Sequence, residues 1–138
     1  MKNINFYSAV AVIFCSIMNF ESFSKTKVLE DDAVSVWVDY NYTGNRQILK
    51  PGNYSTNPSS VKNSDYENVQ KLTINNGNGN WNKLSSLTVP KGYSVLMFFK
   101  PDFTGNSVSF TAETDAIQEN HICDSVNDKI ESIIVAKN

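Results

Sequence analysis

The chain has 138 residues, of which 41% are hydrophobic, and it carries a formal net charge of −2 with a sequence pI near 5.3. This hydrophobic content is enough for one domain with a buried core, and it excludes a globally disordered chain. The 12 lysines and arginines are scattered along the sequence, so the basic face that nucleic-acid binders normally present is not expected.

The N-terminal stretch has the pattern of a secretory signal peptide. Lys2 precedes an apolar run from Phe6 to Phe20, and Ser22-Phe23-Ser24 fits a small-x-small cleavage site. A membrane anchor is the alternative, but the run is shorter than the roughly 20 apolar residues that a spanning helix needs. We therefore predict a signal peptide over residues 1–24 and a secreted, extracellular or periplasmic protein that is not held in the membrane after cleavage.

The chain has two cysteines, and cleavage would remove Cys15 and leave Cys123. A cysteine without an intramolecular partner in an oxidising compartment can link two chains, so we expect a monomer or a Cys123-linked dimer. A buried, apolar Cys123 is the alternative. His121 lies two residues earlier, but no orienting Asn or Asp is evident in the sequence, and no GxSxG, HExxH or phosphate-binding motif is present. The sequence therefore predicts a protein that is not an enzyme.

From Ala33 onward the pattern is that of short β-strands. Val34, Val36 and Val38 alternate with polar or amphipathic residues, a period of two that indicates a half-buried strand. The segments 40–45, 57–68 and 76–80 are rich in Asn, Ser and Gly and predict turns, a loop and a linker. The strands expected in this half are 34–38, 46–50, a piece that starts at Tyr54, a short one within 69–75, and 87–89.

The second half follows the same order. Strands are expected at 93–100, 108–111 and 131–136, with a turn at 101–106 and an irregular or extended segment at 116–123. The carboxylates in the remaining loops are expected to be solvated charges; they are Asp65, Glu67, Glu113, Asp115 and Glu119.

The two halves can be aligned residue by residue, which indicates an internal duplication. Trp37-x6-Gly44 matches Phe98-x6-Gly105, Thr-Gly-Asn occurs at both turns, and Ser86 matches Ser132. The first half is longer, because 42 residues separate Gly44 from Ser86 and 27 separate Gly105 from Ser132. An all-β domain over 33–136 is therefore expected, with one Greek key at 33–90, a second at 92–136, and two four-stranded antiparallel sheets packed face to face. Trp37, Tyr42, Phe98 and Phe103 are expected to form an aromatic corner over each hairpin.

A six-residue polar loop precedes the last strand of each half. Trp81-Asn82-Lys83-Leu84-Ser85-Ser86 and Asn127-Asp128-Lys129-Ile130-Glu131-Ser132 both offer the oxygen atoms that Ca²⁺ prefers. Asn- and Asp-rich loops also form simple turns, because their side chains cap their own backbone. Together with the two hairpins and the two serines, the loops resemble the βγ-crystallin superfamily in its microbial, calcium-binding branch, over residues 33–136.

This resemblance implies two Ca²⁺ sites, each formed by both loops and a backbone carbonyl. The first would use Asn127 and Asp128 completed by Ser85, and the second would use Asn82 completed by Glu131. The backbone carbonyls would come from Val38 and Phe99. The chain departs from the family pattern at Trp81, which replaces an Asn or Asp, and at Glu131, which replaces a Ser or Thr. We therefore expect a complete site at Asn127 and leave the Asn82 site open.

The resulting prediction is a secreted, non-enzymatic Ca²⁺-binding domain that its ion stabilises. One alternative is an extracellular module for a protein or glycan partner, with the Tyr54–Tyr66 insertion and Trp81 as its recognition surface. Another alternative is a protease inhibitor of the same fold, an interpretation that depends on fold analogy alone.

Overall fold

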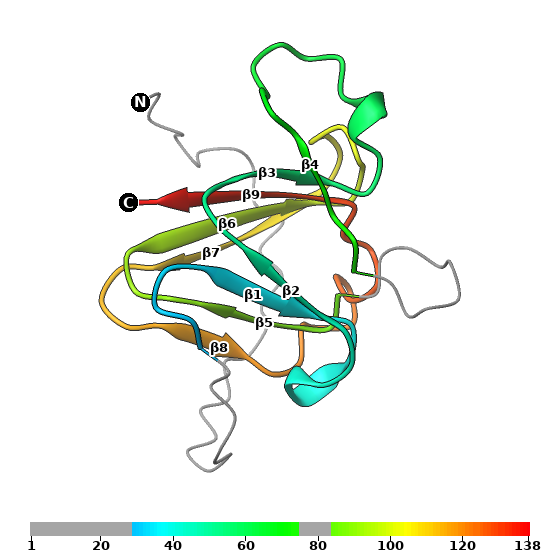
Figure 1. The fold of residues 1–138 in the computed structure, drawn as a ribbon. Coiled ribbons are helices and arrows are strands. Elements are labelled where there is room, and N and C mark those ends of the chain that lie inside the picture. The colour runs from blue at the N-terminus through cyan, green and yellow to red at the C-terminus, as the bar shows by residue number, and fades with distance from the viewer. Residues whose placement is uncertain (1–28, 75–83) are drawn as a thin grey trace.

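The computed structural model describes residues 29–74 and 84–138, and within them the regular secondary structure is almost entirely β-strand (Figure 1). No helix in these two ranges has the length and apolar character that a membrane span needs. The strands are β1 (Val34–Trp37), β2 (Arg46–Leu49), β3 (Gly52–Ser55), β4 (Gln70–Lys71), β5 (Ser86–Val89), β6 (Tyr93–Phe98), β7 (Ser107–Ala112), β8 (Ile117–Glu119) and β9 (Ser132–Lys137). Two single-turn 3₁₀ helices accompany them, η1 (Tyr40–Tyr42) and η2 (Pro58–Ser60).

The strands form two sheets, and each half of the chain contributes one strand to the sheet that the other half mainly forms. One sheet has the order β2-β1-β5-β8 and the other the order β4-β3-β9-β6-β7. Strand β3 of the first half therefore pairs with β9, and β8 of the second half pairs with β5. Neither half can complete its own sheet alone, so the two halves are mutually dependent.

The core lies between the sheets and is built by the alternation visible in the sequence. Val34 and Val36 of β1 are fully buried, and Leu87 and Val89 of β5 lie beside them. Because side chains alternate across a strand, these residues share one face, and removing them from water is the main favourable term in folding. The opposite sheet contributes Tyr54, Val95, Met97, Ile133 and Val135.

The second sheet differs from the expected four antiparallel strands. It has a fifth strand, β4, which pairs in parallel with β3 through Tyr54↔Gln70 and Ser55↔Lys71. The longer connection of the first half returns the chain alongside β3, so the extra length forms an added edge strand and a loop. The Gln47 side chain secures this return, because its amide nitrogen donates to the Lys71 carbonyl and its oxygen accepts the Thr73 N–H.

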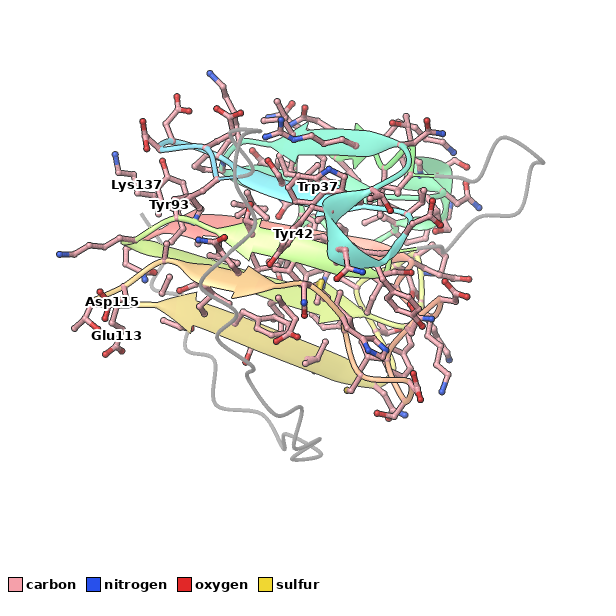
Figure 2. The ribbon with its side chains drawn as sticks, turned by 90° about the horizontal axis from the view of Figure 1, so that it is seen from below. Trp37, Tyr42, Tyr93, Glu113, Asp115 and Lys137 are labelled. Atoms are coloured by element: carbon pink, nitrogen blue, oxygen red, sulfur yellow. The ribbon has the colours of Figure 1, made fainter. Side chains whose placement is uncertain are left out.

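Both hairpin turns carry the expected aromatic corner. Trp37 and Tyr42 meet edge to face with ring centroids 5.3 Å apart, and Phe98 and Phe103 do so at 6.1 Å. Figure 2 shows the first of these pairs. Tyr42 and Phe103 both adopt a positive φ, near 60°, which is unusual for aromatic residues. Such a conformation persists only where surrounding contacts hold it.

Two buried serines hold these corners in place. The Ser86 hydroxyl donates to the Asp39 carbonyl at 2.7 Å and accepts the Tyr42 N–H at 3.1 Å. The Ser132 hydroxyl donates to the Lys100 carbonyl at 2.6 Å and accepts the Phe103 N–H at 3.2 Å. Each hydroxyl therefore satisfies one donor and one acceptor of the turn that carries the positive-φ aromatic residue.

Glu119 is buried, contrary to the expectation of a solvated charge. Only 4% of its surface is exposed, and its Oε2 atom has no hydrogen-bond partner among the residues that the structure describes. It ends β8 and pairs with Leu87 of β5, so its side chain points to the same side of the sheet as a core leucine. Burial raises the pKa of Glu119 above its ordinary value, and the His121 backbone hydrogen bond and imidazole only partly oppose that shift. Burial and the charge of Glu119 in turn raise the pKa of Tyr42 to about 12.

Replacing Ser132 by alanine is expected to destabilise the domain by roughly 2–4 kcal/mol, because it leaves the buried Phe103 N–H and the partly buried Lys100 carbonyl without their partner. Urea unfolding followed by tryptophan fluorescence measures this change. Ser64→Ala, in an exposed loop, should stay within about 0.5 kcal/mol of the parent. A loss for Ser132→Ala as small as that of the control would contradict the role given to the hydroxyl.

Glu119→Gln is expected to stabilise the protein at neutral pH and to have little effect in acid. The pKa of Glu119 is raised in the folded state, so the unfolded chain loses this proton first as the pH rises above the ordinary value of 4.5. The parent therefore loses stability over that range, and the neutral variant does not. Thermal melts from pH 4 to 8 should show a growing difference in melting temperature, with exposed Glu67→Gln as the control. A difference that does not change with pH would refute the assignment.

Candidate metal site

The two predicted loops enter their strands through equivalent backbone contacts. The Ser85 N–H donates to the Trp37 carbonyl at 2.9 Å, and the Glu131 N–H donates to the Phe98 carbonyl at 2.9 Å. Each loop therefore ends beside the aromatic residue that begins its hairpin turn. Val38 and Phe99, the two predicted carbonyl ligands, are the next residues along the chain.

A second pair of contacts joins each loop to a segment of the other half of the chain. The Ser85 carbonyl accepts the Ile122 N–H at 2.8 Å, and the Glu131 carbonyl accepts the Thr56 N–H at 2.9 Å. Ile122 belongs to the second half and Thr56 to the first, so each bond crosses from one half of the chain to the other. The backbone positions of Ser85 and Glu131 are thus fixed from two sides.

The backbone at Val38 and Phe99 is also fixed. The Val38 N–H donates to the Asn45 carbonyl at 3.1 Å, and the Phe99 N–H donates to the Asn106 carbonyl at 2.9 Å. These bonds close the two hairpins just before their turns. Val38 is buried, while Phe99 is partly buried and packs against the core.

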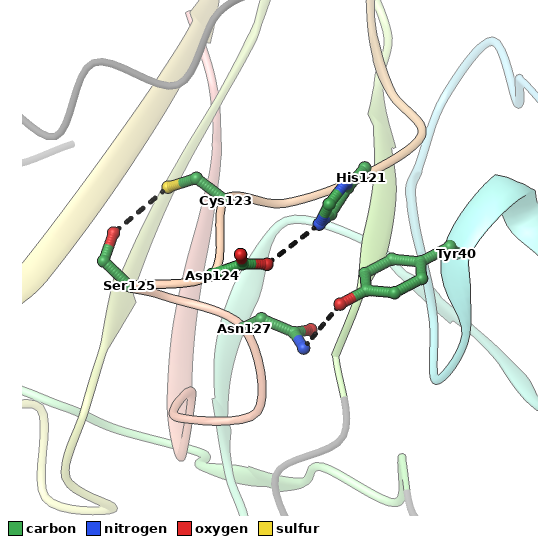
Figure 3. Close-up of polar contacts among 6 residues, drawn as sticks. All are labelled: Tyr40, His121, Cys123, Asp124, Ser125 and Asn127. Atoms are coloured by element: carbon green, nitrogen blue, oxygen red, sulfur yellow. Dashed lines mark hydrogen bonds and ion pairs between the residues drawn. The ribbon is translucent and has the colours of Figure 1, made fainter.

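Asn127 carries the most informative geometry of the site. Its amide nitrogen donates to the Tyr40 hydroxyl at 3.0 Å, which orients the side chain (Figure 3). Its amide oxygen is then a buried atom with no hydrogen-bond partner among the described residues. Buried amide oxygens are nearly always satisfied in folded proteins, so this oxygen marks a position that a water or an ion can fill.

The loop that carries Asn127 is a turn held by backbone hydrogen bonds. The Cys123 carbonyl accepts the N–H groups of both Val126 and Asn127 at 2.9 Å. Val126 and Ile130 are buried on either side of the turn and anchor it in the core. Asp128, at its apex, has φ near 61°, a left-handed conformation that Asp tolerates better than most residues.

Tyr40 connects this loop to the first half of the chain, a role that the sequence did not indicate. It begins η1, two residues after Val38, and the Asn41 N–H next to it donates to the Asn120 carbonyl at 2.8 Å. The Asn127 loop, η1 and the start of β5 therefore lie at one end of the sandwich (Figure 1). The local sequence indicates only a turn at Tyr40, because a contact between residues 87 positions apart has no local signal.

The potential ligand atoms at this end of the molecule are oxygen atoms of the kind that a hard cation prefers. In the described ranges, no group of three or more His, Cys, Asp or Glu residues is arranged to hold a metal ion. A site at Asn127 must therefore draw on amide, hydroxyl and backbone oxygens together with at most two carboxylates. Oxygen donors of this kind suit Ca²⁺ or Mg²⁺ and do not suit the soft metals that prefer thiolate ligands.

His121 and Cys123 have separate partners, as Figure 3 shows. The His121 Nε2 atom lies 3.2 Å from an Asp124 carboxylate oxygen, and the imidazole contacts the Tyr40 ring with centroids 4.1 Å apart and the ring planes tilted by 55°. The Cys123 sulfur lies 3.4 Å from the Ser125 hydroxyl. A Cys15 partner for Cys123 would lie outside the described residues.

Two aromatic residues of the proposed recognition surface are already used for packing. Tyr54 is 4% exposed and its hydroxyl donates to the Lys50 carbonyl at 2.8 Å. Tyr66 stacks on Phe103 with ring centroids 4.3 Å apart. The predicted ligand Asn82 and its neighbour Trp81 lie outside the described residues.

Comparison with known proteins gives matches at the level of structure. No protein-family model and no curated protein matches the sequence. The fold is similar to the N-terminal domain of protein S, with 22% identity over 76% of this chain and 96% of that chain, at a TM-score of 0.55. A βγ-crystallin domain from Flavobacterium johnsoniae matches with 25% identity over 78% of this chain and 97% of that chain, at a TM-score of 0.55.

A third similar structure holds a metal. It is a clostrillin double mutant with two serine-to-histidine substitutions, in complex with nickel, and it matches with 25% identity at a TM-score of 0.52. The match covers 75% of this chain and 97% of that chain. Together with the paired corners and serines, these matches confirm the resemblance found in the sequence: the chain has the βγ-crystallin fold.

Proposed function

We propose that this protein is a secreted, non-enzymatic domain that binds Ca²⁺ between the Asn127 loop and the start of β5 and is stabilised by the ion. The buried, unpartnered amide oxygen of Asn127 is the observation that supports this proposal most directly. A cation there would remove the cost of a buried, unsatisfied oxygen atom. The predicted signal peptide over residues 1–24 supports secretion.

The residues that would hold the ion come from both halves of the chain. Asn127 and Asp128 would supply side-chain oxygens, Ser85 a hydroxyl and Val38 a backbone carbonyl. Ser85 and Val38 are positioned by the hydrogen bonds of Ser85 to Trp37 and of Val38 to Asn45. When bound, Ca²⁺ supplies positive charge that neutralises the Asp128 carboxylate and links two loops far apart in the sequence.

The second site, with Asn82, Glu131 and the Phe99 carbonyl, is part of the same proposal with a different expectation. Trp81 stands where the family pattern has an oxygen ligand, while Glu131 offers a carboxylate in place of a hydroxyl. A carboxylate can bind Ca²⁺ through two oxygens, so Glu131 can offset the missing ligand. Titration calorimetry counts the sites directly.

Stabilisation would follow from preferential binding to the folded state, because the ligands meet only when both halves are folded. An ion present at a hundred times its dissociation constant adds about 2.7 kcal/mol to the free energy of unfolding. That is a large share of the roughly 5–15 kcal/mol that holds a small domain together.

Calcium is therefore expected to raise the melting temperature, and Asp128→Ala should remove most of the rise. Differential scanning calorimetry in EDTA and in millimolar Ca²⁺ measures both effects. Asp115→Ala removes an exposed carboxylate from the other end of the molecule, near Glu113 in Figure 2, and should keep the full rise. An unchanged melt of the parent protein in Ca²⁺ would refute the proposal.

Asn127→Asp should change stability in opposite directions with and without the ion. In EDTA the variant buries an unpaired carboxylate oxygen and should melt below the parent, whereas a carboxylate is a stronger Ca²⁺ ligand than an amide and should bind the ion more tightly. Titration calorimetry and melts in EDTA give the two readouts. Exposed Asn63→Asp, in the loop before β4, makes the same charge change and should affect neither. If Asn127→Asp does not bind Ca²⁺ more tightly than the parent, this oxygen does not face the ion.

A further inference from the structure

Four strands lie at the edges of the two sheets, and one of them lacks the features that normally prevent edge-to-edge association. β2 carries Arg46, β4 is only two residues long and includes Lys71, and β8 is three residues long and ends at Glu119. Charges and short length of this kind are how natural edges avoid further pairing. β7 has six residues, Ser-Val-Ser-Phe-Thr-Ala, with no charge and no proline.

Alternate residues of β7 direct their backbone groups away from the sheet. The Phe99 N–H donates to the Asn106 carbonyl, and the Gly92 N–H donates to the Ala112 carbonyl. In the register of the two strands, the even-numbered residues of β7 are therefore the ones whose backbone groups bond to β6. In an antiparallel ladder the residues between them face outward. Ser107, Ser109 and Thr111 therefore present their N–H and C=O groups at the outer edge, where no described strand pairs with them.

We propose that β7 pairs antiparallel with β7 of a second copy of this chain, about a two-fold axis at Ser109. In this register Ser109 meets Ser109 of the other copy, and Ser107 meets Thr111. All the outward-facing residues of the strand are then paired, which gives about six backbone hydrogen bonds. The two five-stranded sheets would join into one continuous sheet.

The side chains favour the same register. It places Val108 directly opposite Phe110 of the other copy, twice by symmetry. Both are partly buried residues that pack against the core, so their remaining exposed surfaces would cover each other. Apolar pairs directly opposite across two strands stabilise a sheet.

The charges beyond the strand also match. The same register brings Gly105 opposite Glu113 of the second copy. The Lys100 side chain runs over Gly105, with its Cγ, Cδ and Cε atoms 3.2–3.7 Å from where a Cβ of residue 105 would lie. Lys100 of each copy would therefore face Glu113 of the other, and this two-fold complementarity favours a second copy over an unrelated strand.

The test is sedimentation velocity of the purified protein over a concentration series, in a reducing buffer that excludes a Cys123-linked dimer. The parent should form a concentration-dependent dimer, with or without Ca²⁺. Ser109→Lys puts like charges opposite each other at the axis and should leave a monomer, while Ser64→Lys, in a loop, should leave the dimer intact. A parent that stays monomeric, or a dimer that survives Ser109→Lys, overturns the proposal.

A charge exchange tests the register. Lys100→Glu and Glu113→Lys should each weaken the dimer, because each puts like charges together across the interface. The double variant restores opposite charges and should regain the affinity of the parent. Circular dichroism confirms that each variant remains folded. If the double variant instead loses as much dimer affinity as the two single variants together, these residues do not meet.

Discussion

A serine hydroxyl, fully buried at the start of the last strand of each half, is the contact on which the rest of this structure depends. Ser86 and Ser132 each bridge a carbonyl and an N–H of a hairpin turn more than 25 residues away in sequence. These turns hold Tyr42 and Phe103 in the left-handed region, which a bulky side chain rarely occupies. The hydrogen bonds of these hydroxyls thus offset the conformational cost of the turn.

The candidate metal site is built on these same corners. Ser85 and Glu131 immediately precede the two bridging serines, and their N–H groups bond to Trp37 and Phe98. The residues that fold the hairpin and those that would hold an ion are thus neighbours in sequence. In the proposed mechanism, a cation adds a link between halves that are already joined by strand exchange, so binding and folding stability are coupled.

The two unsatisfied buried oxygens of the described ranges differ in what they imply. Asn127 Oδ1 lies in a loop rich in other oxygen donors, beside a tyrosine that fixes the amide orientation. Glu119 Oε2 belongs to a residue that pairs with the core leucine Leu87 across the sheet, and burial raises the pKa of its carboxyl group. A neutral amide oxygen in an oxygen-rich loop suits a cation, whereas a carboxyl with a raised pKa makes stability depend on pH.

The local sequence was enough to predict the β class, the positions of most strands, the aromatic corners and the equivalence of Ser86 with Ser132, because alternation and turn chemistry act over a few residues. It also pointed to Asn127 through the character of its loop. The tertiary structure alone decided that β3 and β8 change sheets, that β4 adds a fifth strand, that Glu119 is buried and that Tyr40 orients Asn127. Each of these depends on contacts between segments far apart in the chain, and such contacts leave no periodic pattern within a single segment.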